Sequence, residues 1–292
     1  MVDFGQYIIH GLAFGAIYAL VALGFNLIFK TTGVVNFAAG AMGTAVTMIL
    51  WSTLDRSVPL AAAWLIAMAA ALLIGVLTEA IFMQRVERSP VLIQIVVTLG
   101  LLLVIEGAVN RIWGAEPKLI PSLASSKALA IGSWYTSAND IFIMALTLSL
   151  AGVLYLALER TRYGLAMRAV AQDREVAALM GIRSFRYVTA SWAVGVLVAG
   201  VGAVLFVPLY GGGLVPTMMD NVAVFAFAAA VLGGFGSLAG AVVGGFLIGI
   251  FSNLVGGYLS TDLEVSLIFL LIVLVLYVRP QGLFGVDAKT RL

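Results

Sequence analysis

The stretch YIIHGLAFGAIYALVALGFNLIF, residues 7–29, contains 23 consecutive residues without a Lys, Arg, Asp or Glu. An α-helix needs roughly 20 predominantly apolar residues to cross the hydrocarbon core of a bilayer. No basic segment precedes the stretch, and it is longer than the apolar part of a secretory signal peptide. We therefore expect residues 7–29 to form a transmembrane helix rather than a cleaved leader.

Composition extends this prediction to the whole chain. Hydrophobic residues make up 62% and charged residues 10% of the 292 residues, whereas soluble domains average about 45–50% and about 25%. One soluble core cannot hide such an apolar surplus, and the charged residues gather between long uncharged stretches. We expect an all-α polytopic membrane protein with a single transmembrane domain over residues 1–292.

Further apolar runs predict eight or nine membrane helices. The run from Val222 to Leu259 is too long for one crossing and too short for two full ones. Gly233-Gly234-Phe235-Gly236-Ser237 interrupts it, so we expect a short broken helix near residues 222–237, a tight turn and then a second helix. The other runs are residues 34–51, 58–82, 90–113, 141–158, 187–210 and 263–278.

Small residues recur every four positions in two of these runs. Gly11 and Gly15 do so in the first run, and at and after the break the same spacing relates Gly236, Gly240 and Gly244, and Gly245 and Gly249. Small residues at this spacing allow membrane helices to approach closely. We therefore expect helix–helix contacts at both places.

The basic residues predict the orientation. With nine crossings and the N-terminus outside, twelve of the sixteen Lys and Arg fall on one side. Basic residues concentrate in cytoplasmic loops, so we expect the N-terminus outside and the C-terminus in the cytoplasm. Residues 114–140 then form the largest outer loop and residues 159–186 the largest inner loop.

Missing residue types exclude several kinds of chemistry. The chain has no cysteine and one histidine, His10, so we expect no metal centre, no disulfide and no histidine-based proton relay. It contains no Gly-Lys dipeptide and hence no phosphate-binding loop for ATP. Ser237 follows a glycine-rich turn, yet no membrane histidine is present to activate it, which argues against an intramembrane protease. We expect no cofactor in this chain and no nucleic-acid partner.

The inner loop 159–186, ERTRYGLAMRAVAQDREVAALMGIRSFR, carries helical periodicity as well as basic residues. A short amphipathic helix in such a loop lies either on lipid headgroups or in a groove of a partner protein. The residues by themselves leave both possibilities open.

A resemblance decides between them. Glu175-Val176-Ala177-Ala178-Leu179-Met180-Gly181 resembles the EAA loop of ABC importer permeases, with Val176 in place of one alanine. Other segments resemble the branched-chain amino acid (Leu/Ile/Val) importer branch of those permeases and occur in the family's order. They are residues 11–43, 161–182, GGFGSLAGAVVGG at 233–245, and RPQGLF at 279–284.

The resemblance implies the fold of an ABC importer permease in a bacterial inner membrane. Two separate cytoplasmic subunits would bind ATP and Mg²⁺, a second related permease would complete a heterodimer, and an extracytoplasmic solute-binding protein would deliver the cargo. The cargo would be a branched-chain amino acid or a related solute such as urea or an amide. The implied ATPase-coupling residues are Arg168, Asp173, Glu175, Ala177, Ala178 and Gly181.

Polar residues inside the apolar runs are candidates for a translocation path. They are Asn36, Thr98, Glu106, Asn110 and Asn253. Two have structural alternatives: Asn36 could cap the second helix, and Glu106 could pair with Arg111. An ion-coupled secondary transporter is the alternative function, and it would place acidic groups at mid-membrane. Glu106 is the only fair candidate for such a group, and we find no matching acidic residue on another predicted helix.

Overall fold

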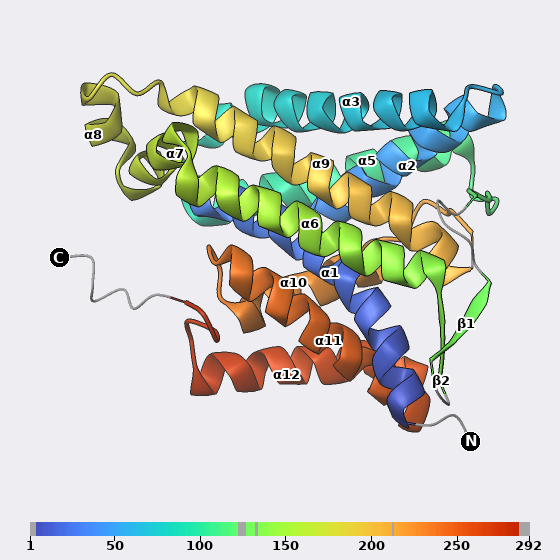
Figure 1. Cartoon of the computed structure of the whole chain (residues 1–292). Helices are drawn as coiled ribbons and strands as arrows, with labels where there is room; N and C mark the ends of the chain where they lie inside the picture. Colours follow the sequence, from blue (N-terminus) through green and yellow to red (C-terminus); the bar gives the residue numbers. More distant parts are fainter. Residues whose placement is uncertain (1–3, 122–126, 132–133, 212, 286–292) are drawn as a thin grey trace.

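The computed structural model describes residues 4–121, 127–131, 134–211 and 213–285, and they form a helical bundle with one short β-hairpin (Figure 1). The helices confirm the all-α prediction. The elements are α1 (Phe4–Thr32), α2 (Ala39–Asp55), α3 (Leu60–Thr78), the π-helical turn η1 (Glu79–Met83), α4 (Gln84–Val86), α5 (Val91–Trp113), β1 (Ala128–Ile131), β2 (Trp134–Ser137), α6 (Ala138–Arg160), α7 (Arg162–Gln172), α8 (Arg174–Leu179), α9 (Ser184–Tyr210), α10 (Asp220–Gly233), α11 (Leu238–Tyr258), the short 3-10 turn η2 (Thr261–Leu263) and α12 (Glu264–Val278).

The predicted number of eight to nine membrane helices is slightly too high. Among the described residues, seven helices are long and apolar enough to cross a membrane: Phe4–Thr32, Leu60–Val86, Val91–Trp113, Ala138–Arg160, Ser184–Tyr210, Leu238–Tyr258 and Thr261–Val278. Helix α2 has 17 residues and α10 has 14. At 1.5 Å per residue α10 spans about 21 Å, less than the roughly 30 Å of a hydrocarbon core. Both are largely buried, so neighbouring helices rather than lipid surround them.

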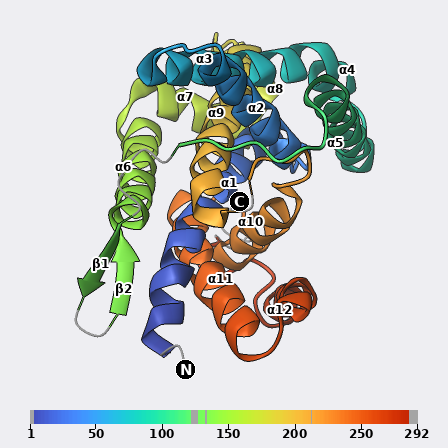
Figure 2. The same cartoon turned by 90° about the vertical axis from the view of Figure 1, so that its right-hand side faces the viewer.

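Helix α1 forms the centre of the bundle and α12 lies at its edge (Figure 2). Over 18 residues of α1, 83% are buried, whereas over the 18 residues of Thr261–Val278, which comprise η2 and α12, 11% are buried. Large apolar side chains of α3, α5 and α12 are exposed, among them Leu65, Leu103 and Tyr277. Such outward apolar surfaces are expected where lipid or another membrane subunit is the neighbour.

Helices α1 and α11 approach so closely that only glycine fits between them, as the spacing of small residues predicts. A Cβ atom on Gly245 would lie 2.5 Å from the Cα of Ala19. A Cβ on Gly249 would lie 2.3 Å from the Cα of Gly15, and one on Gly15 would lie 2.8 Å from the Cα of Phe246. These positions are therefore closed to any larger residue unless the helices separate.

The predicted break after α10 is confirmed, and two other segments hold it in place. Asn26 of α1 donates from Nδ2 to the Ser237 carbonyl (2.9 Å), and its Oδ1 accepts from the Gly236 amide (3.3 Å). The amides of Leu283 and Phe284 donate to the carbonyls of Leu232 (2.8 Å) and Gly233 (3.0 Å). The RPQGLF segment thus satisfies carbonyls that the end of a helix leaves without a partner.

The β-hairpin lies at the end of the bundle opposite α7 and α8, beside the start of α1 (Figure 1). Its strands pair antiparallel with Ala128 opposite Ser137. Gln6 donates to the Tyr135 carbonyl (2.6 Å) and accepts from the Tyr135 amide (2.8 Å). The described part of the 114–140 loop is therefore tied to the first helix.

We predict that Gly245→Ala destabilises the bundle because its methyl group collides with the α1 backbone. Overpacking of this kind costs about 1–3 kcal/mol, which would lower the midpoint of thermal unfolding in detergent. Gly100→Ala in α5 is the matched control, since a Cβ there meets no heavy atom within 4 Å. Equal midpoints for the two variants would contradict the close α1–α11 packing.

Candidate functional site

The segment containing the EAA-like motif folds into two short helices with well-defined ends. Thr161 caps α7 by accepting from the Gly164 amide (3.1 Å). Asp173 caps α8 by accepting from the amides of Glu175 (2.9 Å) and Val176 (3.0 Å). Side chains with short oxygen-bearing groups are the preferred residues at this position.

Helix α8 ends in a Schellman motif at Gly181. The Gly181 amide donates to the Ala178 carbonyl (3.0 Å), and the Ile182 amide donates to the Ala177 carbonyl (3.0 Å). Gly181 has a φ of +82°, a conformation that glycine adopts at little cost. The glycine of the motif is thus needed for the turn that ends α8.

The side chains of α8 and its end divide into a packed side and an open side. Ala177 is buried, whereas Leu179 is 87% and Met180 is 78% exposed. Val176, Ala178 and Glu175 are exposed as well. An uncovered group of apolar side chains on a short loop helix is typical of a protein-contact surface. We name Val176, Leu179 and Met180 the α8 apolar face.

Arg174, which the sequence analysis did not single out, attaches α8 to the membrane helices. Its guanidinium forms an ion pair with Glu87, between α4 and α5, and donates to the Thr31 carbonyl in the last turn of α1 (2.8 Å). Its own carbonyl accepts from the Ser184 hydroxyl at the start of α9 (3.3 Å). Burial lowers the pKa of Arg174, and the charge of Glu79 acts against this shift, but an arginine stays protonated in proteins.

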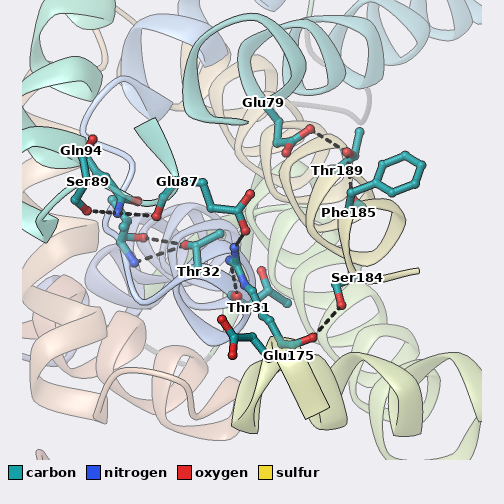
Figure 3. A network of polar contacts seen from close by, with 12 residues as sticks. Thr31, Thr32, Glu79, Glu87, Ser89, Gln94, Glu175, Ser184, Phe185 and Thr189 are labelled. Carbon is teal, nitrogen blue, oxygen red and sulfur yellow. Dashed lines mark hydrogen bonds and ion pairs between the residues drawn. The ribbon is translucent and has the colours of Figure 1, made fainter. Parts of the chain in front are cut away.

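A second polar contact joins α9 to the π-helical turn at the same end of the bundle. The Thr189 hydroxyl donates to the Glu79 carboxylate at 2.5 Å (Figure 3). Glu79 is buried, so this bond supplies part of the compensation that a buried carboxylate needs. This bond joins α9 to the π-helical turn that follows α3. The contacts of Arg174 join α8 to α1, to α9 and to Glu87, which lies a few residues further along the chain.

Two of the predicted path residues meet at the connection between α1 and α2: Asn36 belongs to this connection, and Thr98 of α5 contacts it. Asn36 accepts from the Ala38 amide (3.1 Å) in the turn before α2. Ala38 is the N-cap of α2 and no side chain caps this helix, so the expectation that Asn36 caps it is wrong. Thr98 of α5 accepts from the Phe37 amide (3.4 Å) and donates to the carbonyls of Ile95 and Val35. Both side chains are fully buried, and these bonds give them a structural role.

Glu106 has an acidic neighbour that the sequence analysis missed. Its carboxyl lies close enough to that of Asp220, the first residue of α10, for the two groups to interact. The expectation that no acidic residue on another helix matches Glu106 is therefore wrong. The cause is that helix packing brings Asp220, an exposed residue at the start of α10, next to α5, while the sequence shows it only as the border of an apolar run.

Of the remaining two path candidates, Asn110 lies one helical turn from Glu106 on α5, and Asn253 belongs to another helix. Asn110 of α5 is exposed. Asn253 donates to the Gly249 carbonyl of its own helix, α11 (3.2 Å). A role for either on the path stays a prediction.

Comparison with known proteins covers almost the whole chain. The model of the family described as "Branched-chain amino acid transport system / permease component" matches residues 7–278. The high-affinity branched-chain amino acid transport permease LivH of Salmonella typhimurium is 31% identical over 301 residues, covering 97% of this chain and 96% of LivH. BraD of Pseudomonas aeruginosa, a permease described in the same terms, is 31% identical over 297 residues, covering 96% of this chain and 95% of BraD.

A solved structure shares the fold. PsaBC from Streptococcus pneumoniae, in complex with Fab, superposes with a TM-score of 0.52 over 96% of this chain and 93% of the other, at 12% identity. Identity this low carries the fold alone, whereas the family match and the two permeases carry the assignment. The chain therefore belongs to the family of branched-chain amino acid transport permeases and is a multi-pass membrane permease subunit of an ABC importer.

Proposed function

We propose that this permease carries leucine, isoleucine and valine from an extracytoplasmic binding protein into the cytoplasm, driven by ATP. The observation that carries the proposal is the similarity to permeases of that description over 97% of the chain. A related small polar solute such as urea or an amide is the other possible cargo. The solute-binding protein would make most of this choice, because a path that bound its cargo tightly would not release it.

The ATPase would be supplied by two partner subunits, one of which would dock on the α8 apolar face of this chain. This chain has no phosphate-binding loop of its own, so ATP and Mg²⁺ would bind to the partners. Asp173 and Gly181 would define the two ends of the docking helix, and Ala177 would seat it on the bundle. Glu175 and Ala178 are exposed and would meet the partner, while Arg168 pairs with Glu159 behind them.

The anchoring of α8 suggests how ATPase movement reaches the membrane. A displacement of α8 would act through Arg174 on the end of α1 and on the connection to α5, and through Ser184 on α9. Helix α1 packs directly against α11, so the displacement would reach the centre of the bundle. Two ATPases require two such loops, and a second, related permease would supply the other in a heterodimer.

Glu106 and Asp220 are the best placed of the polar groups for contact with cargo. Carboxyl groups attract the ammonium group of an amino acid, and a carboxyl at membrane depth is expected to face protein or a water-filled cavity. The same pair also favours the alternative of an ion-coupled transporter, since such proteins hold protons on carboxyl groups within the membrane. The family match outweighs this alternative. The ion-coupled function rests on a single contact, between Glu106 and Asp220, whereas the similarity to permeases of ABC importers extends over nearly the whole chain.

The proposed orientation places the N-terminus outside and α7 and α8 in the cytoplasm of a bacterium, within its inner membrane. It rests on the distribution of basic residues. The chain has no cysteine, so Glu116→Cys and Glu175→Cys each introduce a single exposed thiol at opposite ends of the bundle. An impermeant maleimide should label Glu116→Cys in intact spheroplasts and Glu175→Cys only after permeabilisation. The reverse pattern would invert the orientation.

We predict that Leu179→Glu abolishes ATP-driven leucine uptake and releases the ATPase subunits. Leu179 is almost fully exposed in the isolated permease, so the change leaves its fold intact. In the docked state it would bury an unpaired carboxylate, which costs at least several kcal/mol. The measurements are co-purification of the ATPase subunits and uptake of labelled leucine at matched expression, with excess unlabelled urea as competitor.

The matched control for this substitution is Leu119→Glu, since Leu119 is also exposed but belongs to the 114–140 loop. It should retain both the ATPase subunits and uptake. If Leu179→Glu behaves like this control, α8 is not the docking helix. Competition by urea in the control would reassign the cargo and leave the docking result unchanged.

The Arg174–Glu87 pair gives a separate prediction for transmission. Arg174→Gln and Glu87→Gln should each reduce uptake at least tenfold while the ATPase subunits remain bound, because the pair lies behind the α8 apolar face. The double exchange Arg174→Glu with Glu87→Arg should restore part of the uptake. Loss of ATPase binding in the single variants would instead mean that the pair only supports the shape of α8.

A further inference from the structure

A cavity of about 730 Å³ opens at the α7 end of the bundle, and the proposed function assigns no ligand to it. The end of α1, the last turns of α6, helix α7, the turn between α10 and α11, and residues 284–285 line it. Leu179 and Met180 of the α8 apolar face are not among the lining residues. The cavity therefore lies beside the α8 apolar face, and it shares Arg168 and Arg174 with the proposed coupling segment.

The charged side chains of the cavity are predominantly cationic. Lys30, Arg168 and Arg174 line it together with one carboxylate, Glu159. Glu159 forms an ion pair with Arg168 and a longer one with Lys30 (3.9 Å). Arg174 is already paired with Glu87. In the described lining, Lys30 and Arg168 therefore share the single negative charge of Glu159, which leaves one positive charge without a counter-charge. A pocket with a net positive charge attracts an anion.

Hydrogen-bond donors of the lining suit the same kind of ligand. The Lys30 ammonium has three donors and the Arg168 guanidinium has five, and their side chains are only 21% and 35% exposed. Charge-assisted bonds from such groups to phosphate oxygens are stronger than neutral ones. The shared chemistry is a phosphate group, either free in solution or on a lipid.

The surface next to the cavity favours the lipid. Leu148, Tyr155 and Leu156 of α6 are half or more exposed, and Tyr155 also lines the cavity. At 100° per residue they fall within about 100° of one another on the helix, on the face that carries Glu159. Gly152 lies on this face too, and a Cβ there would meet no heavy atom within 4 Å. An apolar, shallow strip thus continues from the cavity along a membrane-spanning helix.

We propose that this cavity binds the headgroup of an anionic phospholipid whose acyl chains lie along α6. Basic pockets between membrane helices at the cytoplasmic surface bind such headgroups. The cations would hold the phosphate, and the strip on α6 would hold the tails. A free phosphate would use only the first of these two features.

The test measures lipid binding by the full-length permease in neutral detergent, by native mass spectrometry and by thermal unfolding. The probes are phosphatidylglycerol, phosphatidylcholine and inorganic phosphate. Only phosphatidylglycerol should bind and raise the unfolding midpoint. Lys30→Gln should weaken its binding about fivefold and Glu159→Gln should strengthen it by a similar factor, since one cation near an anionic lipid contributes roughly that much.

Arg162→Gln is the matched control, because Arg162 is exposed in the same loop and does not line the cavity. It should bind phosphatidylglycerol like the unchanged protein. Equal affinity in all three variants would overturn the assignment to this cavity, and Glu159→Gln alone decides the matter if Lys30→Gln does not fold. Equal stabilisation by inorganic phosphate would overturn the lipid in favour of a free anion.

Discussion

The close contact between α1 and α11 is the constraint on which the rest of this structure depends. In lipid, apolar side chains gain little by leaving one apolar surrounding for another, so helices associate through close packing and polar contacts. Gly15, Gly245 and Gly249 bring the two backbones together. Asn26 then reaches the turn before α11, and the RPQGLF segment closes the end of α10. Segments from the start, the last third and the end of the chain meet at this one place.

The proposed ATPase contact on α8 is connected to this membrane core through a few side chains. Helix α8 is short and capped at both ends by local bonds, so it keeps its shape with little support from the membrane helices. Its attachment is concentrated at Arg174 and Ser184. A rigid helix with a few attachments to α1, α9 and the connection before α5 is suited to passing on a displacement.

Local patterns predicted much of this molecule. Apolar runs revealed the seven long membrane helices, the glycine cluster at 233–237 revealed the break, and the EAA-like motif marked the segment in which α8 lies. Each of these signals depends on residues close together in the sequence. The count was too high because α2 and α10 are apolar but short, and an apolar run does not distinguish a crossing helix from one buried among others.

Contacts between distant residues were beyond the sequence analysis. Arg174 and Glu87 are 87 positions apart, and either could pair with many opposite charges. Asp220 approaches Glu106 only because helix packing brings the start of α10 next to α5. The role of Asn26 in holding the turn at Ser237 likewise depends on how α1 crosses α11. In each case the residue type was visible, while its partner was set by helix packing.

The most direct test of the central claim, that this permease is driven by ATP, is uptake by proteoliposomes. They would contain both permeases and the ATPase subunits, with ATP inside and leucine-loaded binding protein outside. Our account predicts that leucine uptake continues when ionophores collapse the proton and sodium gradients, and stops when a non-hydrolysable analogue replaces ATP. Uptake that is abolished by the ionophores in the presence of ATP would contradict it and favour an ion-coupled transporter.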